Sequence, residues 1–211
     1  MFAPLRPIDS SIENDLDNLH PQALRSVYWE IAPDIAVNIA AMGHSRLEKE
    51  AWFFARFADY GQCGVTLSFP TGARATVLYC APHDAPRAQT LESGPVSDDA
   101  QIITSLFIDP QLRSQGMEAV LLDAAVMNLT HRGFPAVEAF GVYEGAEVES
   151  FDRHGRAGIM RAEELMSAGF ELVRDHPVMP RLRLELPPAS DILSAAEAES
   201  LLRSAEMAHA R

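Results

Sequence analysis

Cysteine, basic residues and long apolar runs are all scarce in this sequence of 211 residues. Its two cysteines, Cys63 and Cys80, lie on separate predicted strands, so we expect two buried, reduced thiols rather than a disulfide framework. Lysine and arginine number 17 against 30 acidic residues, and the net charge of −13 argues against non-specific nucleic-acid binding, which needs a basic face. A run of about 18 apolar residues is absent, as is a signal peptide, so we expect no membrane span and a cytoplasmic location.

The composition that remains is that of a folded domain. Hydrophobic residues make up 47% and charged residues 22%, so a packed core is expected. Residues 1–20 are polar and acidic and predict a mobile or loosely docked arm that carries a short strand near Leu5. Residues 21–188 predict one domain, and residues 189–211 predict a terminal helix capped by Ser190 and Asp191. The excess of acidic residues favours the approach of cationic small molecules or peptides. The alternative is that it serves only to keep the protein soluble.

The first part of the domain predicts helices followed by a hairpin. Residues 21–42 look helical but are interrupted by Pro33, after which residues 35–42 predict a second short helix. A capping-box pattern at Ser45 predicts the start of a further helix. Residues 62–69 and 74–80 predict two strands because they are apolar, rich in β-branched side chains and joined by a glycine-bearing turn.

The segment around which the chain is organised runs from residue 101 to residue 133. Residues 101–108 form an apolar run that predicts a buried strand, and Pro110 ends it. A turn with Arg113 and Gly116 then leads into a segment with helical periodicity. The first N–H groups of a helix lack partners within it and lie at the positive end of its dipole, so this turn favours an anion site. Neither a dinucleotide fingerprint nor a P-loop is present, and the alternative is an ordinary loop with a solvated arginine.

Two motifs carry a resemblance to a known family. Residues 106–119, LFIDPQLRSQGMEA, resemble the acetyl-coenzyme A signature of the GNAT superfamily of N-acetyltransferases. Residues 164–173, ELMSAGFELV, are similar to the helix, Gly-Phe and strand near the end of that family's fold. The resemblance covers roughly residues 22–186. It implies an α+β fold with a central mixed, mostly antiparallel sheet of six or seven strands, splayed parallel central strands and helices on both faces.

The resemblance also implies where acetyl-CoA would bind. Its pantetheine arm would hydrogen-bond to main-chain groups of the central strand, and its diphosphate would lie on the turn and the start of the helix. The implied cofactor-binding residues are Leu106, Phe107, Ile108, Arg113, Ser114, Gln115, Gly116, Met117, Glu118 and Ala119. Glu118 departs from the family pattern, which has a small residue there, and like-charge repulsion would oppose a diphosphate beside it.

Glu138 is the one acid in the next predicted strand, residues 135–141, and it is the predicted general base, acting directly or through water. The alternative is a structural carboxylate bonded to the neighbouring backbone. Many family members carry a tyrosine general acid where this chain has Leu165. Tyr143 is the predicted substitute, and the alternative is a thiolate that leaves unassisted.

The acceptor side is the least specific part of the sequence. In the resembled fold the early helices line this side, and two long predicted loops, residues 81–100 and 142–160, would add contacts. The candidate substrate-binding residues are Trp29, Glu30, Trp52 and His83. Core packing is the alternative for the aromatic residues, and a solvated loop is the alternative for the histidine.

The sequence therefore predicts an N-acetyltransferase that moves an acetyl group from acetyl-CoA to a primary amine of a small molecule or peptide, by direct transfer in a ternary complex. No metal, nucleic acid or membrane partner is expected. The apolar stripe of the terminal helix would pack on the same chain or on a second copy in a homodimer. The alternatives are a catalytically impaired coenzyme A-binding or regulatory module and, more distantly, a protein-interaction domain without a ligand.

Overall fold

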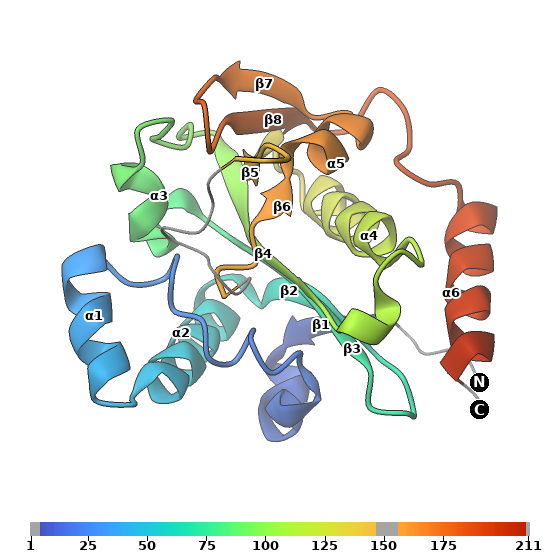
Figure 1. Ribbon diagram of the computed structural model, residues 1–211, viewed down its shortest axis with the longest axis horizontal. Coiled ribbons are helices and arrows are strands. Elements are labelled where there is room, and N and C mark those ends of the chain that lie inside the picture. The colour runs from blue at the N-terminus through green and yellow to red at the C-terminus, as the bar shows by residue number, and fades with distance from the viewer. Residues whose placement is uncertain (1–4, 147–155, 210–211) are drawn as a thin grey trace.

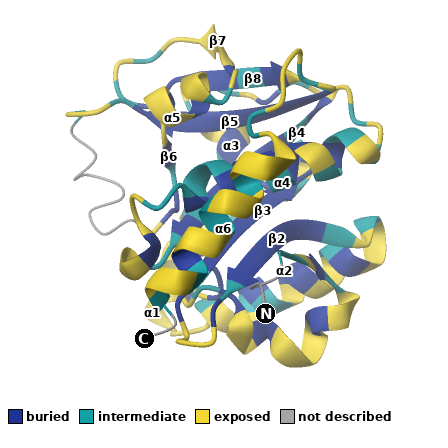
Figure 2. Cartoon of the chain, turned by 90° about the vertical axis from the view of Figure 1, so that its right-hand side faces the viewer, coloured by how far each residue is buried: buried dark blue, intermediate teal, exposed yellow. Residues whose placement is uncertain are grey.

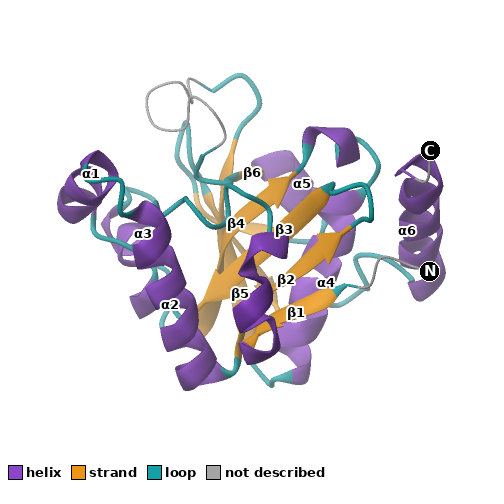
Figure 3. Cartoon of the chain, turned by 90° about the horizontal axis from the view of Figure 1, so that it is seen from below, coloured by secondary structure: helices purple, strands orange, loops and turns teal. Residues whose placement is uncertain are grey.

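The computed structural model describes residues 5–146 and 156–209, and within them a mixed sheet separates two layers of helices (Figures 1 and 3). The strands run in the order β1-β2-β3-β4-β5-β8-β7, and the short β6 pairs with β5 outside that path. Their bounds are β1 Arg6–Asp9, β2 Gln62–Ser68, β3 Arg74–Cys80, β4 Ala100–Ile108, β5 Ala136–Val142, β6 Met160–Arg161, β7 Glu171–Arg174 and β8 Arg181–Glu185. Pairs β4–β5 and β5–β6 are parallel and the others are antiparallel. The predicted mixed, mostly antiparallel sheet is confirmed.

Helices cover both faces of this sheet, as predicted. One layer holds α1, α2 and α3, and the other holds α4, α5 and α6 (Figure 3). Their bounds are α1 Pro33–Ala41, α2 Ser45–Tyr60, α3 Pro86–Thr90, α4 Met117–His131, α5 Ala162–Ser167 and α6 Ala195–His209. Three 3-10 segments are η1 Ser10–Asn18, η2 Pro82–Asp84 and η3 Pro110–Leu112.

The sheet has a hydrophobic core on each face. Side chains of a strand point alternately to the two faces, so Val137 and Ala139 of β5 join the core under α4, while Ala136 and Phe140 join the core under α2. Figure 2 shows the central strands as mostly buried, whereas β7 and the outer face of α6 are exposed. The helices therefore act as amphipathic covers for a sheet that is apolar on both sides.

The described part of residues 1–20 is docked on the sheet rather than mobile, and it includes β1, the short strand predicted near Leu5. β1 pairs antiparallel with β2 at the edge of the sheet. Ile8, Ile12, Leu16 and Leu19 are buried, so η1 is docked against the core under α2. Acidic residues dominate the composition of this segment, but its apolar side chains share one face, and that face is buried.

The helix starts also differ from the prediction. Residues 21–32 form turns rather than a helix. The short helix predicted for residues 35–42 is present as α1, but it begins at Pro33, where the missing N–H of proline has no cost in a first turn. α2 begins at Ser45 itself, with His44 at the cap position and no side-chain hydrogen bond there. The capping box predicted at Ser45 is therefore absent.

Two later segments are corrected in the same way. α6 is capped by Ser194 and Glu197 rather than by Ser190 and Asp191, because the Ser194 N–H donates to Glu197 Oε2 at 2.8 Å and the Glu197 N–H donates to Ser194 Oγ at 3.3 Å. The predicted long loop of residues 81–100 contains η2 and α3, and the side chains of Ala85 and Ala88 in this segment are buried. Small alanines give a weak hydrophobic signal in sequence.

A bulge in β4 decides which residues of this strand face which core. Ser105 pairs with Leu78 and Ile103 pairs with Tyr79, so Thr104 is an extra residue on β4. As a result Ile103 faces the core under α4, and so do the even-numbered residues that follow the bulge. The bulge therefore sets the direction in which the side chains of the last three residues of β4 point.

Candidate functional site

β4 and β5 are paired only at the start of β4. Their parallel register runs from Ala100↔Ala136 to Ile103↔Ala139, and the strands separate beyond it (Figure 1). A cavity of about 1050 Å³ opens at this end of β4, between the loop before α4, α5 and residues 158–161. The predicted splay of the parallel strands thus coincides with a space large enough for a cofactor.

The turn between β4 and α4 has the geometry of an anion site. Asp109 accepts a main-chain N–H of η3, and the buried Leu112 and Met117 fix the two ends of the turn in the core. Ser114, with φ 60°, and Gly116, with φ 76°, both adopt left-handed conformations, which turn successive N–H groups toward one side. No side chain caps α4, so its first N–H groups are left for a ligand at the positive end of the helix dipole.

Most of the predicted cofactor-binding residues meet in this cavity. Those that line it are Leu106, Phe107, Ile108, Arg113, Ser114, Gly116, Glu118 and Ala119. Gln115 turns away and donates from Nε2 to the Gln111 carbonyl at 2.6 Å, while the Met117 side chain is buried in the core. Arg113 is exposed, and no ion pair among the described residues involves it. The Glu118 carboxylate lies on the cavity wall, where its charge opposes an anion.

The edge of β4 that no longer pairs with β5 faces the gap between the strands. The Asp109 N–H donates to the Arg74 carbonyl of β3 at 2.9 Å. Because N–H groups alternate along an antiparallel pair, those of Leu106 and Ile108 point to the opposite side, away from β3. The Leu106 N–H donates there to the Gly158 carbonyl at 2.7 Å.

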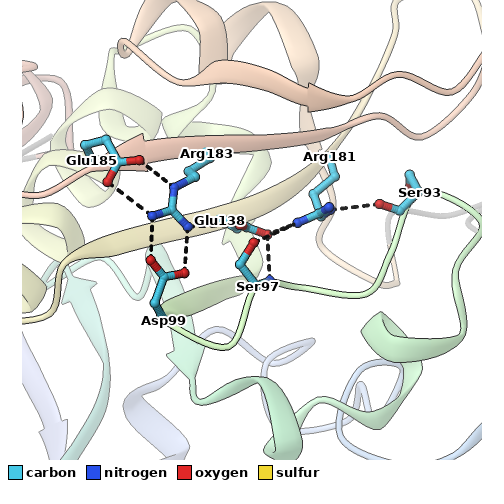
Figure 4. Close-up of polar contacts among 7 residues, drawn as sticks. All are labelled: Ser93, Ser97, Asp99, Glu138, Arg181, Arg183 and Glu185. Atoms are coloured by element: carbon cyan, nitrogen blue, oxygen red, sulfur yellow. Dashed lines mark hydrogen bonds and ion pairs between the residues drawn. The ribbon is translucent and has the colours of Figure 1, made fainter.

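Glu138 is placed away from the cavity. Its side chain is fully buried, and Arg181 of β8 pairs with Oε2 while Arg183 Nη1 donates to Oε1 at 3.3 Å (Figure 4). The Ser97 N–H also donates to Oε2, at 3.3 Å. A carboxylate enclosed by two guanidinium groups has no route to an amine in the cavity. We therefore correct the assignment of Glu138 as general base, and the geometry favours the structural alternative.

Tyr143 is also outside the cavity lining. It follows β5, and its hydroxyl donates to Asp175 Oδ1 at 3.1 Å. Burial and this bond raise the pKa of Tyr143 above its usual value. Leu165, which stands where many resembled proteins have a tyrosine, is buried in the core and leaves no hydroxyl on that part of α5. The structure therefore does not bring a tyrosine general acid to the cavity.

The four candidate substrate contacts lie outside the cavity lining as well. Trp29 is buried under β5, and Glu30 is buried beside Lys49, with which it forms an ion pair. Trp52 is buried and donates its indole N–H to a main-chain carbonyl at 3.1 Å. The His83 side chain is 74% exposed on the surface. Core packing, the alternative considered for the aromatic residues, accounts for both tryptophans.

His20 and Gln22 line the cavity, although no sequence motif assigned either of them a role. The His20 ring stacks on Phe107, with centroids 5.7 Å apart and an interplanar angle of 12°. The Gln22 N–H donates to His20 Nδ1 at 3.2 Å, so the proton of the neutral ring is on Nε2. Burial lowers the pKa of His20 from its usual 6.5, Asp109 opposes this shift, and Arg113 adds to it. A lone histidine between η1 and a turn carries no periodic signal that would reveal it.

The C-terminal segment completes the wall of the site. Ile192 lines the cavity, and Leu201 of α6 covers Gly116 so closely that a Cβ on this glycine would lie 2.9 Å from the leucine Cδ2. Ala205 is buried in the core under α4. The apolar stripe of α6 therefore packs on its own chain, which is the first of the two predicted arrangements.

Cys63 and Cys80 are buried free thiols, as expected, and burial raises the pKa of both.

Within residues 5–146 and 156–209, no group of three or more His, Cys, Asp or Glu side chains is arranged to hold a metal ion. In the same part of the chain, no helix combines the length and apolarity needed to cross a membrane.

No protein-family model matches this sequence, and no curated protein does. In backbone the chain is similar to solved N-acetyltransferases. One from Staphylococcus aureus Mu50 is 14% identical, with 87% of this chain and 98% of that chain covered and a TM-score of 0.49. The PaiA N-acetyltransferase from Thermoplasma acidophilum, solved with coenzyme A, is 10% identical, with 86% and 98% covered and a TM-score of 0.48. A GNAT superfamily phosphinothricin acetyltransferase from Sinorhizobium meliloti, solved with acetyl-CoA, is 16% identical, with 88% and 89% covered and a TM-score of 0.45.

Proposed function

We propose that the cavity at the end of β4 binds acetyl-CoA and that the protein transfers the acetyl group to a primary amine of a small molecule or peptide. The observation that carries this proposal is that one cavity joins the gap-side edge of β4 to the turn before α4, where Ser114 and Gly116 adopt left-handed conformations. A coenzyme A thioester combines a diphosphate with an extended, amide-bearing arm. It therefore requires an anion site and a strand edge within a single span.

The proposed reaction is direct transfer in a ternary complex. The amine nitrogen attacks the thioester carbonyl, a C–N bond forms, the C–S bond breaks, and coenzyme A leaves as a thiolate. Holding both reactants in contact lowers the barrier by pre-organisation, and the N–H groups on the gap side of β4 are donors for the oxyanion. Because Glu138 and Tyr143 do not line the cavity, the amine proton goes to water, and the thiolate takes its proton from water.

Binding is tested by titrating acetyl-CoA into the protein and into an Arg113→Ala variant. We expect the variant to bind about tenfold more weakly or worse, because a charge-assisted contact to a phosphate is lost. Arg25 is exposed and does not line the cavity, so Arg25→Ala is the matched control and should bind as the unmodified protein does. Equal affinity of all three proteins would remove the anchor of the proposal.

Turnover is tested by measuring thiol release from acetyl-CoA in the presence of a panel of primary amines. We expect release that depends on the amine, together with an acetylated product of matching mass. The buried, high-pKa thiols of Cys63 and Cys80 should add no background to such an assay.

A coenzyme A-binding module without catalysis is the second candidate, and two observations favour it. Glu118 places a negative charge on the cavity wall, and the Leu106 N–H is already bonded to the Gly158 carbonyl. Saturable coenzyme binding with no amine-dependent thiol release would select this candidate over the transferase.

A further inference from the structure

Residues 157–161, which we name the strap, lie in the gap where β4 and β5 have separated. The strap contacts β4 through its first two residues. Its last two residues form β6, which pairs in parallel with β5 through Gly141↔Met160 (Figure 1). The strap therefore bridges two strands that no longer bond to each other, in the position that an extended ligand would take.

Three hydrogen bonds hold the strap against β4 and the core under α2. The Ala157 carbonyl accepts from Trp29 Nε1 at 3.1 Å and from Ser105 Oγ at 3.0 Å. The Leu106 N–H donates to the Gly158 carbonyl at 2.7 Å. All three donors come from buried or half-buried residues, so the strap satisfies polar groups that would otherwise face the gap.

Gly158 allows the strap to lie this close to the strand. Its φ is +66°, a conformation that favours glycine, and a Cβ at this position would lie 2.8 Å from Phe107 Cζ and 3.0 Å from Ser105 Cβ. A side chain at position 158 would therefore push the strap away from β4.

We propose that the strap is an internal stand-in for the thioester arm, and that the arm must displace it to reach the Leu106 N–H. This inference rests on the proposed function, because it concerns the acyl end of the same cavity. The Gly158 carbonyl and the thioester carbonyl are acceptors of the same kind, and one N–H on a strand edge serves one of them at a time. The described state is thus closed at the acyl end, while the anion-binding turn is open.

The energetic balance makes such an exchange feasible. A single hydrogen bond of this kind shifts an equilibrium by about two- to tenfold after the competing bonds to water are counted. Binding of the arm restores the bond at Leu106 and adds new contacts along the rest of the edge. The free energy needed to release the strap therefore lowers the apparent affinity for the full coenzyme. Binding of the nucleotide part alone does not require this release, so its affinity is unchanged.

The indole N–H signals of the two tryptophans report the state of the strap directly. Trp29 donates to the strap at the Ala157 carbonyl, whereas Trp52 donates to the Asp84 carbonyl and serves as the internal reference. In ¹⁵N–¹H spectra we expect saturating acetyl-CoA to shift the Trp29 signal and to leave the Trp52 signal in place. The arm-free probe 3′-phosphoadenosine 5′-diphosphate should shift neither. A Trp29 signal that stays in place at saturation with acetyl-CoA would overturn the inference.

Variants of the strap test the same exchange by affinity. Gly158→Ala should strengthen acetyl-CoA binding by about three- to thirtyfold, because left-handed backbone and a steric contact both disfavour the docked strap. Ser105→Ala removes one bond to the strap and should strengthen it by about two- to tenfold. Gly43 has φ +73°, and a Cβ on it would have no atom within 4 Å, so Gly43→Ala is the control that should not change affinity.

The arm-free probe separates the two levels of the proposal. If the probe and acetyl-CoA both bind, while the strap variants leave acetyl-CoA affinity unchanged or weaken it, the strap inference fails alone. If neither ligand binds to the unmodified protein, the proposed function fails. Thermal unfolding of each variant identifies any that has lost its fold, and the spectra of the unmodified protein still decide the question.

Discussion

At the scale of single residues, two arginines of β8 determine what Glu138 does. Arg181 and Arg183 are two positions apart, so both guanidinium groups lie on the same face of the strand, and Glu138 of β5 is in register with Arg183. Arg183 also pairs with Asp99 and Glu185, as Figure 4 shows. The carboxylate is thus the buried end of a charge network that ties β5 and β8 to the loop before β4.

We predict that Glu138→Gln lowers the free energy of unfolding by about 3 kcal/mol, because it leaves a buried guanidinium without its full counter-charge. Urea unfolding measures this loss, and Glu171→Gln on the exposed β7 is the control that should change little. The folded variant should keep kcat within about threefold, whereas loss of a true general base would cost about a hundredfold or more. A large fall in kcat with unchanged stability would restore Glu138 as the base.

His20 gives a pH dependence whose sign follows from its lowered pKa. The unfolded chain has the usual histidine pKa of 6.5, and the folded value is lower. Between these values the unfolded state binds a proton that the folded state does not, so stability falls as the pH drops below 6.5 and is recovered as it rises. We predict that His20→Asn loses less stability than the unmodified protein between about pH 7 and pH 5. Denaturant unfolding measures the free energy of unfolding of both proteins at each pH. If the two free energies fall equally between about pH 7 and pH 5, the prediction is wrong.

How much of the site can be predicted from sequence depends on how local its interactions are. The turn before α4 could be predicted because Arg113, Gly116 and the start of α4 are neighbours in the chain, and anion binding there stays a prediction. The partner of Glu138 could not, because Arg181 lies 43 residues away on a strand that pairs only in the fold. The stacking of His20 on Phe107 is equally non-local.

At the scale of elements, α6 supports the anion-binding turn from outside. We predict that Leu201→Ala weakens acetyl-CoA binding by about two- to tenfold, because it opens space beside Gly116 and loosens the turn that aligns the N–H groups. Calorimetry measures the affinity, and Met207→Ala on the exposed face of the same helix is the control. Unchanged affinity in Leu201→Ala would show that α6 is a cover without a role in binding.

The elements that sequence predicts well are those with strong apolar runs. β2, β3, β4 and β5 begin and end within a residue or so of the predicted bounds, because their side chains are buried on both faces. η1 and α3 escape prediction because acidic residues or alanines mask their short apolar faces. The bulge at Thr104 and the strap depend on tertiary packing, so no local pattern predicts them.

At the scale of the whole molecule, the proposed anion site belongs to an acidic protein. The net charge of −13 repels a polyanion at long range, while Arg113, Arg74 and the N-terminus of α4 attract it at short range. Under the proposed function, binding would therefore depend on the local geometry of the turn rather than on the overall charge.

Ligand binding to the folded state should raise thermal stability. At a concentration of acetyl-CoA one hundred times Kd, the gain is about 2.7 kcal/mol, which corresponds to about 5–10 °C in Tm for a domain of this size. Differential scanning calorimetry measures the shift, and Arg113→Ala at the same ligand concentration should show a smaller one. An equal shift in both proteins would mean that the ligand binds elsewhere.

The position of the diphosphate in a crystal of the protein grown with acetyl-CoA tests the central claim most directly. We predict density for the diphosphate about 3 Å from the main-chain N–H groups of residues 114–118, with the pantetheine arm extending toward Leu106. Density at another surface, or an empty turn in crystals grown at saturating acetyl-CoA, would contradict the assignment of this cavity as the thioester site.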